Sequence, residues 1–287
     1  MKCIKTYSFA STTVRLVSDC PVEDTEYYSR FLTDKTPDVT VNIFCGKLPQ
    51  INGEVIAKSE KKTVIKNDSG FFVYTSYYNQ KKPGFVTYAC KAEHESIIDL
   101  YIDFAGGLWD KMIFNALDIP QIMVNFGSLL IHCSVVEYKG KGIMFAGDSG
   151  AGKSTQASLW KQYRGAEIIN GDRGAICADG GGFNVYGVPF NGTSAICQNK
   201  SCKAELLVLI GRGEKNEFFK LDGASAFRML LGKTTYYEWD RQSVESVLDI
   251  LDRFVKAVPV FCLKCLPDES AVRTLEEGYE QYLSEKQ

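Results

Sequence analysis

The stretch GDSGAGKST at residues 147–155 constrains the fold of this chain more than any other feature. It follows the apolar run GIMFAG and satisfies the pattern G-x-x-x-x-G-K-[ST], whose glycines let successive backbone N–H groups point inward at an anion. Lys153 is expected to reach the β- and γ-phosphates of a nucleotide, and the hydroxyl of Ser154 to bind Mg²⁺. The following helix offers its positive N-terminal end to the same phosphates. The residues predicted to bind the nucleotide are Gly147, Asp148, Ser149, Gly150, Ala151, Gly152, Lys153, Ser154 and Thr155.

The alternative for this loop is an ordinary glycine-rich turn between a strand and a helix. A chain of this length matches the motif by chance on the order of once in a hundred. The apolar run before the loop and the helical pattern KSTQASLWKQY after it supply the context that the motif requires. Nucleotide binding is therefore the stronger interpretation.

The chain shows two patterns around this loop. Residues 1–108 contain short β-branched and aromatic runs separated by turn residues, which predicts a β-rich N-terminal domain with an antiparallel sheet. Residues 109–127 have a helical spacing of apolar residues, interrupted at Pro120, and predict a connecting helix. Strands and helices alternate afterwards, so residues 128–287 predict an α/β nucleotide-binding domain.

Composition narrows the classes of function. The formal net charge is −2 with no block of like charges, which argues against nucleic-acid binding. The longest apolar runs, such as LLVLI at residues 206–210, are too short to span a bilayer. The N-terminus alternates like a strand and lacks the apolar segment of a signal peptide. These patterns predict a cytoplasmic protein with no nucleic-acid or membrane partner.

Ten cysteines are many for such a chain. In the cytosol they are expected to stay reduced, and most of them, such as Cys45, lie inside apolar runs, where they are expected to pack as small hydrophobic side chains. A zinc site could be drawn from Cys197, Cys202, Cys262 and Cys265. However, VPVFCLKCLP alternates like a strand, which would place its two cysteines on opposite faces. Packing is therefore favoured over a metal site.

Transfer of a phosphoryl group also needs an acidic residue that binds Mg²⁺ or takes the proton of the acceptor. Asp172 is the best candidate, because it ends the short strand expected over EIINGD, near the phosphate loop. The alternative is a turn aspartate that pairs with Arg173. Asp179 lies in a glycine-rich hairpin and is more simply a turn former, and Asp148 inside the loop is expected to form a local hydrogen bond.

His132 lies in the strand that precedes the loop strand, and a tight turn at residues 139–141 joins the two. Seven residues separate His132 from Gly140, and six separate Gly140 from Gly147, so antiparallel pairing would bring His132 beside the loop. It is expected either to orient a phosphate or carboxylate, or to be a half-buried histidine with satisfied hydrogen bonds.

Around these residues the chain resembles a known family. HCSVVEYKGKGIMFAGDSGAGKS is similar to the strand–turn–strand–loop block of the catalytic domain of HPr kinase/phosphorylase, in which a histidine precedes the loop at the same spacing. EIINGDRGAI resembles the family strand that ends in Asp-Asp-Arg, and VYGVPFNG resembles the YGTPWNG segment of bacterial HPr-kinase-like proteins. The resemblance is clear over residues 128–192. It implies a domain of the HPr kinase C-terminal type, a mixed sheet with flanking helices related to the phosphoenolpyruvate carboxykinase core.

The resemblance also implies roles for individual residues. Asp172, His132 and Lys153 would be catalytic, Lys153 would bind phosphate, and Ser154 and Asp172 would bind the metal. The chain departs from the family where Gly171 replaces the first aspartate of the pair, where Asn184 replaces a glutamate, and where FCLKC replaces the late Gly-Arg-Asn segment. It is thus expected to be a relative of HPr kinase with a different acceptor.

The expected function is that of an ATP-dependent kinase that uses Mg²⁺, with ATP replaceable by another nucleoside triphosphate. The acceptor would be a hydroxyl group, either of a serine in a protein or peptide or of a small molecule, and the candidate acceptor-site residues are Arg173, Asn191, Gly192 and Arg212. The alternative is a nucleotide-binding regulatory or scaffold protein that transfers no phosphate, since Gly171 removes one acidic group. A carboxykinase is disfavoured, because the sequence shows no His/Lys/Asp cluster of the type that binds Mn²⁺. Base preference and a homo-oligomeric state stay open.

Overall fold

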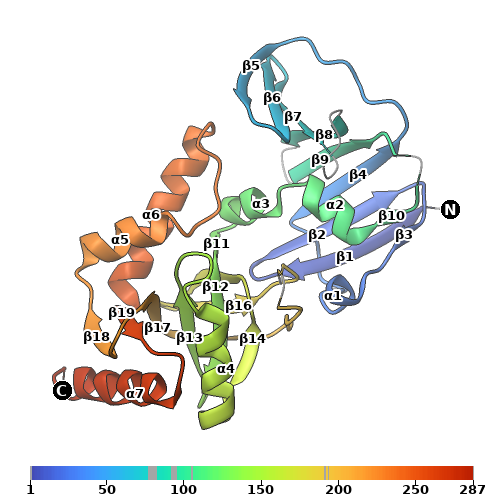
Figure 1. The fold of residues 1–287 in the computed structure, drawn as a ribbon. Coiled ribbons are helices and arrows are strands. Elements are labelled where there is room, and N and C mark those ends of the chain that lie inside the picture. The colour runs from blue at the N-terminus through green and yellow to red at the C-terminus, as the bar shows by residue number, and fades with distance from the viewer. Residues whose placement is uncertain are drawn as a thin grey trace. The chain divides into compact units, whose positions relative to one another are not determined.

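The computed structural model describes residues 2–76, 83–91, 96–104, 106–190, 192 and 194–286. The chain has a mixed α/β fold and divides into two compact units, Met1–Ile122 and Met123–Gln287. The described residues form seven helices and three sheets (Figure 1). None of the helices in this part of the chain has the length and apolar character needed to cross a membrane.

The first unit is built on an eight-stranded sheet. In spatial order its strands are β1 (Cys3–Phe9), β2 (Thr12–Ser18), β4 (Val39–Cys45), β9 (Ser96–Ile102), β8 (Pro83–Lys91), β7 (Gly70–Ser76), β6 (Lys62–Asn67) and β5 (Glu54–Lys58). The unit also contains a short parallel pair, β3 (Val22–Glu23) with β10 (Leu108–Trp109), and the helices α1 (Glu26–Ser29) and α2 (Asp110–Ala116).

The prediction of an antiparallel sheet is wrong at two joints of this unit. Strand β4 pairs in parallel with both β2 and β9, whereas the other neighbours are antiparallel. The chain between β2 and β4 carries β3 and α1, and the chain between β4 and β9 carries four further strands. Connections of this length allow a crossover, which parallel pairing requires. Turn residues in the sequence identify hairpins but do not identify such crossovers.

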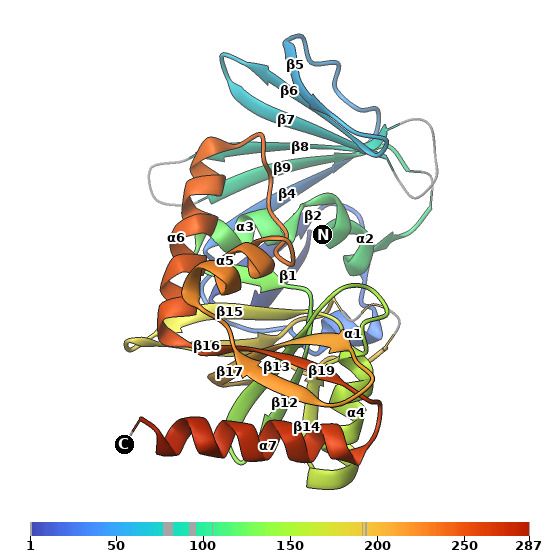
Figure 2. The same cartoon turned by 60° about the vertical axis from the view of Figure 1, so that its left-hand side comes forward.

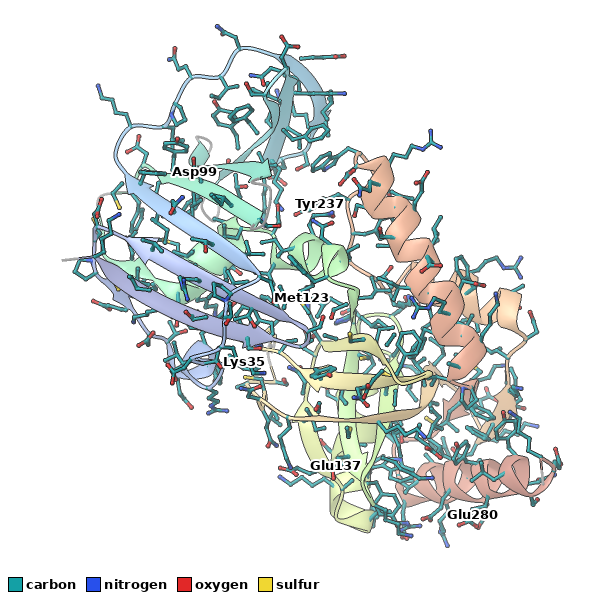
Figure 3. The ribbon with its side chains drawn as sticks, turned by 180° about the vertical axis from the view of Figure 1, so that it is seen from behind. Lys35, Asp99, Met123, Glu137, Tyr237 and Glu280 are labelled. Carbon is teal, nitrogen blue, oxygen red and sulfur yellow. The ribbon has the colours of Figure 1, made fainter. Side chains whose placement is uncertain are left out.

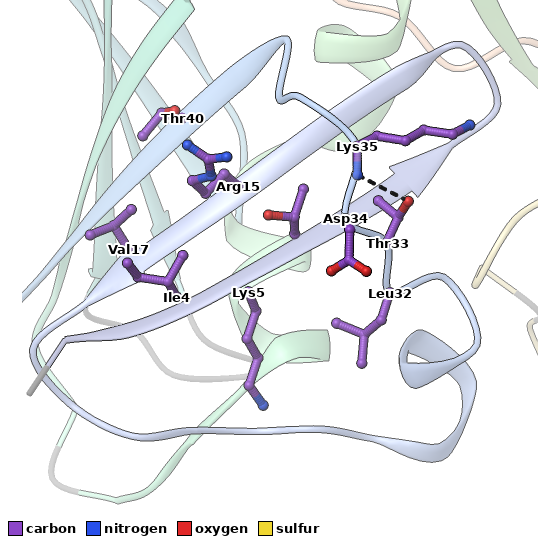
Figure 4. A pocket seen from close by; sticks show the side chains of 10 residues that line it. Ile4, Lys5, Arg15, Val17, Leu32, Thr33, Asp34, Lys35 and Thr40 are labelled. Carbon is purple, nitrogen blue, oxygen red and sulfur yellow. Dashed lines mark hydrogen bonds between the residues drawn. The ribbon is translucent and has the colours of Figure 1, made fainter.

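The alternation of strand side chains separates the two faces of this sheet. Tyr7 and Phe9 of β1 are fully buried, and Phe114 of α2 lies edge-on to both, with ring centroids 4.9 Å apart. The opposite face of β1 and β2 carries an open cavity of about 880 Å³, and Figure 4 shows Arg15 and Lys35 among the side chains that line it. The aromatic side chains therefore lie in the core of this unit, and the other face carries charged side chains together with apolar ones such as Ile4 and Val17.

Residues 109–127 form two short helices instead of one. Helix α2 is followed by α3 (Ile119–Asn125), and the break between them falls at Asp118, which has a φ of +54°. Pro120, where an interruption was expected, lies in the first turn of α3. A proline is tolerated there because an N–H in the first turn has no partner within the helix.

The second unit is built on a nine-stranded mixed sheet, as the resemblance implied. Its strands are β11 (Ser128–Ile131), β15 (Gly174–Asp179), β16 (Gly182–Gly187), β17 (Ser201–Arg212), β13 (Lys141–Ala146), β12 (Cys133–Tyr138) and β14 (Glu167–Asn170), with β19 (Val260–Cys265) beside β17 and β18 (Glu217–Lys220) beside β19. Its further helices are α4 (Lys153–Arg164), α5 (Gly223–Leu231), α6 (Arg241–Ala257) and α7 (Glu269–Ser284).

Helices cover both faces of this second sheet. Along β13, Ile143 and Phe145 pack with α4 and α7, whereas Met144 and Ala146 pack with α5 and α6. This is the alternation expected of a strand that is buried on both sides. Figure 2 shows that α5 and α6 lie together and that α7 lies apart from them. In Figure 3, the labelled Glu137 belongs to β12 and the labelled Glu280 belongs to α7.

The cysteines follow the packing interpretation only in part. Cys133 and Cys197 are buried in the second unit, but Cys45 is exposed. Cys45 is the last residue of β4, where the buried alternation of that strand has ended, so an apolar run in the sequence did not ensure burial. Cys90 lies in a part of β8 whose side chains are outside the described set.

Candidate functional site

Three strands of the second unit end at one edge of the sheet. Strand β12 pairs antiparallel with both β13 and β14, so β13 and β14 run in the same direction, and β17 is parallel to β13. The segments that follow these strands begin at Gly147, Gly171 and Gly213. Ligands of α/β sheets bind outside the carboxyl ends of parallel strands, which makes this edge the candidate site.

The strand–loop–helix order expected around residues 147–155 is present. The loop joins β13 to α4, and Gly147, Gly150 and Gly152 adopt φ angles of +155°, +75° and +108°. These angles favour glycine, and a Cβ on Gly147 would also lie 2.9 Å from the carbonyl oxygen of Ile210. The glycines of the motif are thus required by the path of the loop.

Lys153 lies inside this loop. Its Nζ donates hydrogen bonds to the carbonyl oxygens of Gly147 at 3.1 Å and Asp148 at 3.0 Å, and the residue is only 7% exposed. Burial lowers the pKa of its ammonium group, while Asp172 acts in the opposite direction. The loop therefore binds the Lys153 ammonium group through its own carbonyl oxygens. An anionic ligand can replace these carbonyl oxygens as the partner of the ammonium group.

Asp172 is positioned by a residue that the sequence analysis missed. Asn170, the last residue of β14, is fully buried. Its Oδ1 accepts hydrogen bonds from the backbone N–H groups of Asp172 and Arg173 at 2.9 Å each. Its Nδ2 donates a hydrogen bond to the carbonyl oxygen of Val188 at 2.7 Å. An asparagine that bonds backbone two residues on is a recognised turn former, so the Asn-Gly-Asp order was the available signal.

Replacing Asn170 with alanine is expected to destabilise the protein by about 1–3 kcal/mol, because it leaves the Val188 carbonyl and two turn N–H groups without their partner. The measurement is the free energy of unfolding in urea. Gln242→Ala, an exposed position on α6, serves as the control and is expected to change stability by less than about 0.5 kcal/mol. Equal stabilities of the two variants would show that Asn170 does not hold this turn.

His132 lies beside the loop, as the residue count predicted, but it stands between β11 and β12 instead of inside one strand. Cys133 pairs with Ala146, so His132 stands at the start of the loop. Its Nδ1 lies 3.0 Å from the backbone oxygen of Asp172 and 3.6 Å from Asp172 Oδ1. Burial has the largest effect on the pKa of His132 and lowers it, and the positive charge of Lys153 lowers it further. The negative charge of Asp172 raises it. The lowered pKa favours the neutral imidazole, whose Nδ1–H can donate to the Asp172 carbonyl oxygen.

A pH dependence of stability follows from this lowered pKa. The unfolded chain takes up a proton at His132 near its ordinary pKa of 6.5, whereas the folded protein resists protonation, so His132 is expected to reduce stability as the pH falls below about 6.5. The check compares melting temperatures of the wild type and His132→Asn, which keeps a donor near Nδ1, from pH 8 to pH 5. The melting temperature of the wild type should fall more between pH 8 and pH 5 than that of the variant. Parallel curves of melting temperature against pH would contradict the lowered pKa of His132.

The carbonyl of Gly171 connects the Asp172 turn to the loop helix. It accepts from Ser134 Oγ at 2.8 Å, and Ser154 Oγ lies 3.4 Å from it. A Cβ on Gly171 would lie 2.2 Å from Ser194 Oγ. An aspartate at this position would therefore require Ser194 to move, which gives a physical reason for the glycine.

Two of the acceptor-site candidates contact Asp172. A Cβ on Gly192, which has a φ of +52°, would lie 2.6–2.8 Å from the Asp172 carboxylate, and Arg173 Nε lies 3.5 Å from Asp172 Oδ2. Asn191 lies outside the described residues. Arg212, at the end of β17, instead donates from Nη2 to the carbonyl of Gly150 at 3.0 Å. The structure thus places Arg212 against the loop.

Lys233 is a further residue that the sequence analysis missed. It follows α5, its carbonyl accepts from His132 N at 2.9 Å, and its Nζ forms an ion pair with Asp148 Oδ1. The expectation that Asp148 bonds locally is therefore wrong, because its partner comes from a distant part of the chain. The Lys233 ammonium lowers the pKa of Asp148 and adds a second cation beside Lys153. Nothing in the sequence around Lys233 indicated this position.

Comparison with known proteins adds little to this geometry. No protein-family model matches the chain, and no curated protein matches it. Among solved structures, the chain is similar to the Hpr(Ser) kinase/phosphatase from Coxiella burnetii, with 12% sequence identity and a TM-score of 0.33. The match covers 54% of this chain and 98% of that chain. A likeness this distant leaves the function to be argued from the site.

Proposed function

We propose that the chain is a phosphotransferase that binds a nucleoside triphosphate and Mg²⁺ at residues 147–155 and transfers the γ-phosphate to a hydroxyl group. The observation that carries the proposal is the convergence of Lys153, Ser154, Asp172 and His132 at one edge of the sheet. These side chains supply the phosphate-binding cation, the metal-binding hydroxyl and the carboxylate that phosphoryl transfer requires.

Each side chain has a role in this proposal. When nucleotide binds, the Lys153 ammonium group would leave the loop carbonyl oxygens and bind phosphate oxygens. Lys233, which pairs with Asp148, adds positive charge beside the loop. The Ser154 hydroxyl and the Asp172 carboxylate are hard oxygen donors of the kind that Mg²⁺ prefers, and the metal would neutralise phosphate charge. Neutral His132 holds the backbone of Asp172 through its Nδ1.

The acceptor would enter beside Gly192, against the Asp172 carboxylate. Its hydroxyl oxygen forms the new bond to the γ-phosphorus as the bond to the β–γ bridging oxygen breaks, and its proton passes to Asp172. A single carboxylate suffices for this step, because such transfer depends mainly on positioning and electrostatic stabilisation. On this proposal, glycine at position 171 is compatible with transfer.

The second candidate is a regulatory or scaffold protein that binds nucleotide without transfer, and Gly171 is the observation that favours it. The two are separated by incubating the protein with Mg²⁺, a γ-labelled triphosphate and fractionated cell extract. Label that appears in a protein or a small molecule, and that depends on both Mg²⁺ and the added chain, supports transfer. Tight nucleotide binding without label in any fraction would favour the second candidate.

A further inference from the structure

Two cysteines of the first unit lie at the same end of neighbouring strands. Strands β2 and β4 are parallel, and the last pair in their register joins Ser18 to Ile43. Cys20 and Cys45 are each the second residue beyond this pair. Adjacent strands lie about 4.8 Å apart, which is within the Cα separation of about 4.4–6.8 Å that a disulfide requires. The fold therefore brings together two thiols that residues 21–44 separate in the sequence.

The two thiols contact each other. The Cys45 thiol is hydrogen-bonded to the sulfur of Cys20. Both cysteines are free, Cys45 is exposed and Cys20 is half-buried. The backbone N–H of Cys20 donates to Ser18 Oγ at 3.1 Å, which fixes the turn that carries the Cys20 thiol. A reagent in solution can thus reach a pair of thiols that the fold has already assembled.

Simple packing and metal binding are the alternatives for this pair. Burial of apolar surface does not explain the contact, because Cys45 is exposed. A structural zinc site needs a full tetrahedral set of ligands. Among the residues that the structure describes, no group of three or more His, Cys, Asp and Glu side chains could hold a metal. The chemistry that two adjacent thiols can perform alone is the formation of a disulfide bond.

We propose that Cys20 and Cys45 are a reversible thiol–disulfide pair that reacts with a low-molecular-weight disulfide such as glutathione disulfide. The Cys20 thiolate attacks one sulfur of that disulfide, which forms a mixed disulfide and releases one glutathione thiolate. Cys45 then attacks the Cys20 sulfur, and the second glutathione thiolate leaves. The protons of the two cysteines pass through solvent to the two glutathione thiolates. Two protein thiols are thus oxidised to one disulfide, and glutathione disulfide is reduced to two thiols.

The order of attack follows from the state of Cys45. Reduced solvation of its sulfur and the hydrogen bond with Cys20 raise the pKa of the Cys45 thiol to about 11. Cys45 therefore keeps its proton at neutral pH, whereas the thiolate is the form that attacks a disulfide. Cys20 is accordingly assigned the first attack, and Cys45 resolves the mixed disulfide.

The bond would restrain the segment that it encloses. Residues 21–44 carry β3, α1 and the turn in which Thr33 N donates to the carbonyl oxygen of Thr6 on β1 at 2.9 Å. The same segment contributes residues 32–35 to the open cavity on the sheet. A cross-link limits the freedom of the unfolded chain, so it stabilises the folded state. In a compartment whose thiols are kept reduced, this stabilisation would appear only on oxidation.

The first test maps the bond in the full-length wild-type protein. The protein is equilibrated with mixtures of glutathione and glutathione disulfide, its remaining thiols are alkylated, and it is digested with trypsin without reduction. Mass spectrometry should show the peptides of residues 16–30 and 36–47 joined, with the loss of two hydrogen atoms; Cys20 and Cys45 are the only cysteines in these peptides. Alkylation of both thiols in every mixture, a bond to Cys3 of β1, or glutathione that stays on either cysteine would overturn the pairing.

The second test measures the restraint. Melting temperatures of the oxidised and reduced forms are compared for the wild type, Cys45→Ala and Cys177→Ala, the last being a half-buried cysteine of β15. Oxidation should raise the melting temperature of the wild type and of Cys177→Ala by about 5 °C, and should leave that of Cys45→Ala unchanged. The absence of a shift in wild-type protein whose bond has been mapped, or an equal shift in Cys45→Ala, would overturn the restraint.

Discussion

Replacing Lys153 with alanine is expected to weaken binding of a nucleoside triphosphate by about 30-fold or more. The reason is that a buried ammonium inside the loop is lost, and removing one partner of a buried charge pair costs about 2–5 kcal/mol. The measurement is calorimetric titration with a non-hydrolysable ATP analogue and Mg²⁺. The loop backbone stays in place in this variant, so residual weak binding is expected.

The control for this variant is Lys161→Ala, which removes an exposed lysine from the last turn of the same helix. Its affinity should match that of the wild type, because Lys161 lies at the far end of α4 from the loop. Unfolding without ligand shows whether Lys153→Ala is folded. A folded Lys153→Ala variant with wild-type affinity would contradict the assignment of Lys153 as the phosphate-binding cation.

The second large effect is expected for Asp172→Asn. This substitution keeps the shape of the side chain and removes the charge that would bind the metal and take the acceptor proton, so Mg²⁺-dependent release of phosphate should fall by about 10²–10⁴-fold. The nucleotide affinity should change much less, because Lys153 and the loop backbone remain. The measurement is the rate of phosphate release at saturating triphosphate, with water as the acceptor.

Asp179→Asn provides the comparison for Asp172→Asn. Asp179 accepts from Asn184 across the hairpin of β15 and β16, and it was expected to be a turn residue. The rate should be unchanged in this variant. A wild-type rate in Asp172→Asn would remove the role proposed for its carboxylate, whatever the result for Asp179.

The parts of the site that the sequence predicted depend on short-range spacing. The loop and the helix after it are contiguous, and counting residues across the turn at Gly140 placed His132 beside the loop start. The position of Asp172 followed from the end of one short strand. In each case local periodicity and turn chemistry were sufficient, because few residues separate the groups involved.

The parts that could not be predicted depend on long-range packing. Lys233 reaches Asp148 only because the residues after α5 lie beside His132, between β11 and β12. Gln156 meets Cys265 only because β19 joins the sheet beside β17. The parallel pairing of β4 with β2 and β9 likewise depends on crossovers that no turn residue marks. One sequence offers no local signal for contacts of this kind.

Gly171 shows how a departure from a family pattern acquires a physical explanation. In the sequence it was only a missing acidic group, which favoured loss of transfer. In the structure the space for its side chain is occupied by Ser194, and its carbonyl accepts from Ser134. The local packing at position 171 therefore fits glycine, and the proposal assigns the carboxylate role to Asp172.

The most direct test is the thermal unfolding of the pure protein with ATP, GTP and ADP, each with and without Mg²⁺. A ligand that binds only the folded protein, at about 100 times its dissociation constant, adds roughly 2.7 kcal/mol to stability, which is a visible rise in melting temperature. We expect a rise with ATP that depends on Mg²⁺ and that is lost in Lys153→Ala. The absence of a shift with any nucleotide would contradict nucleotide binding at residues 147–155 and the phosphotransferase proposal with it.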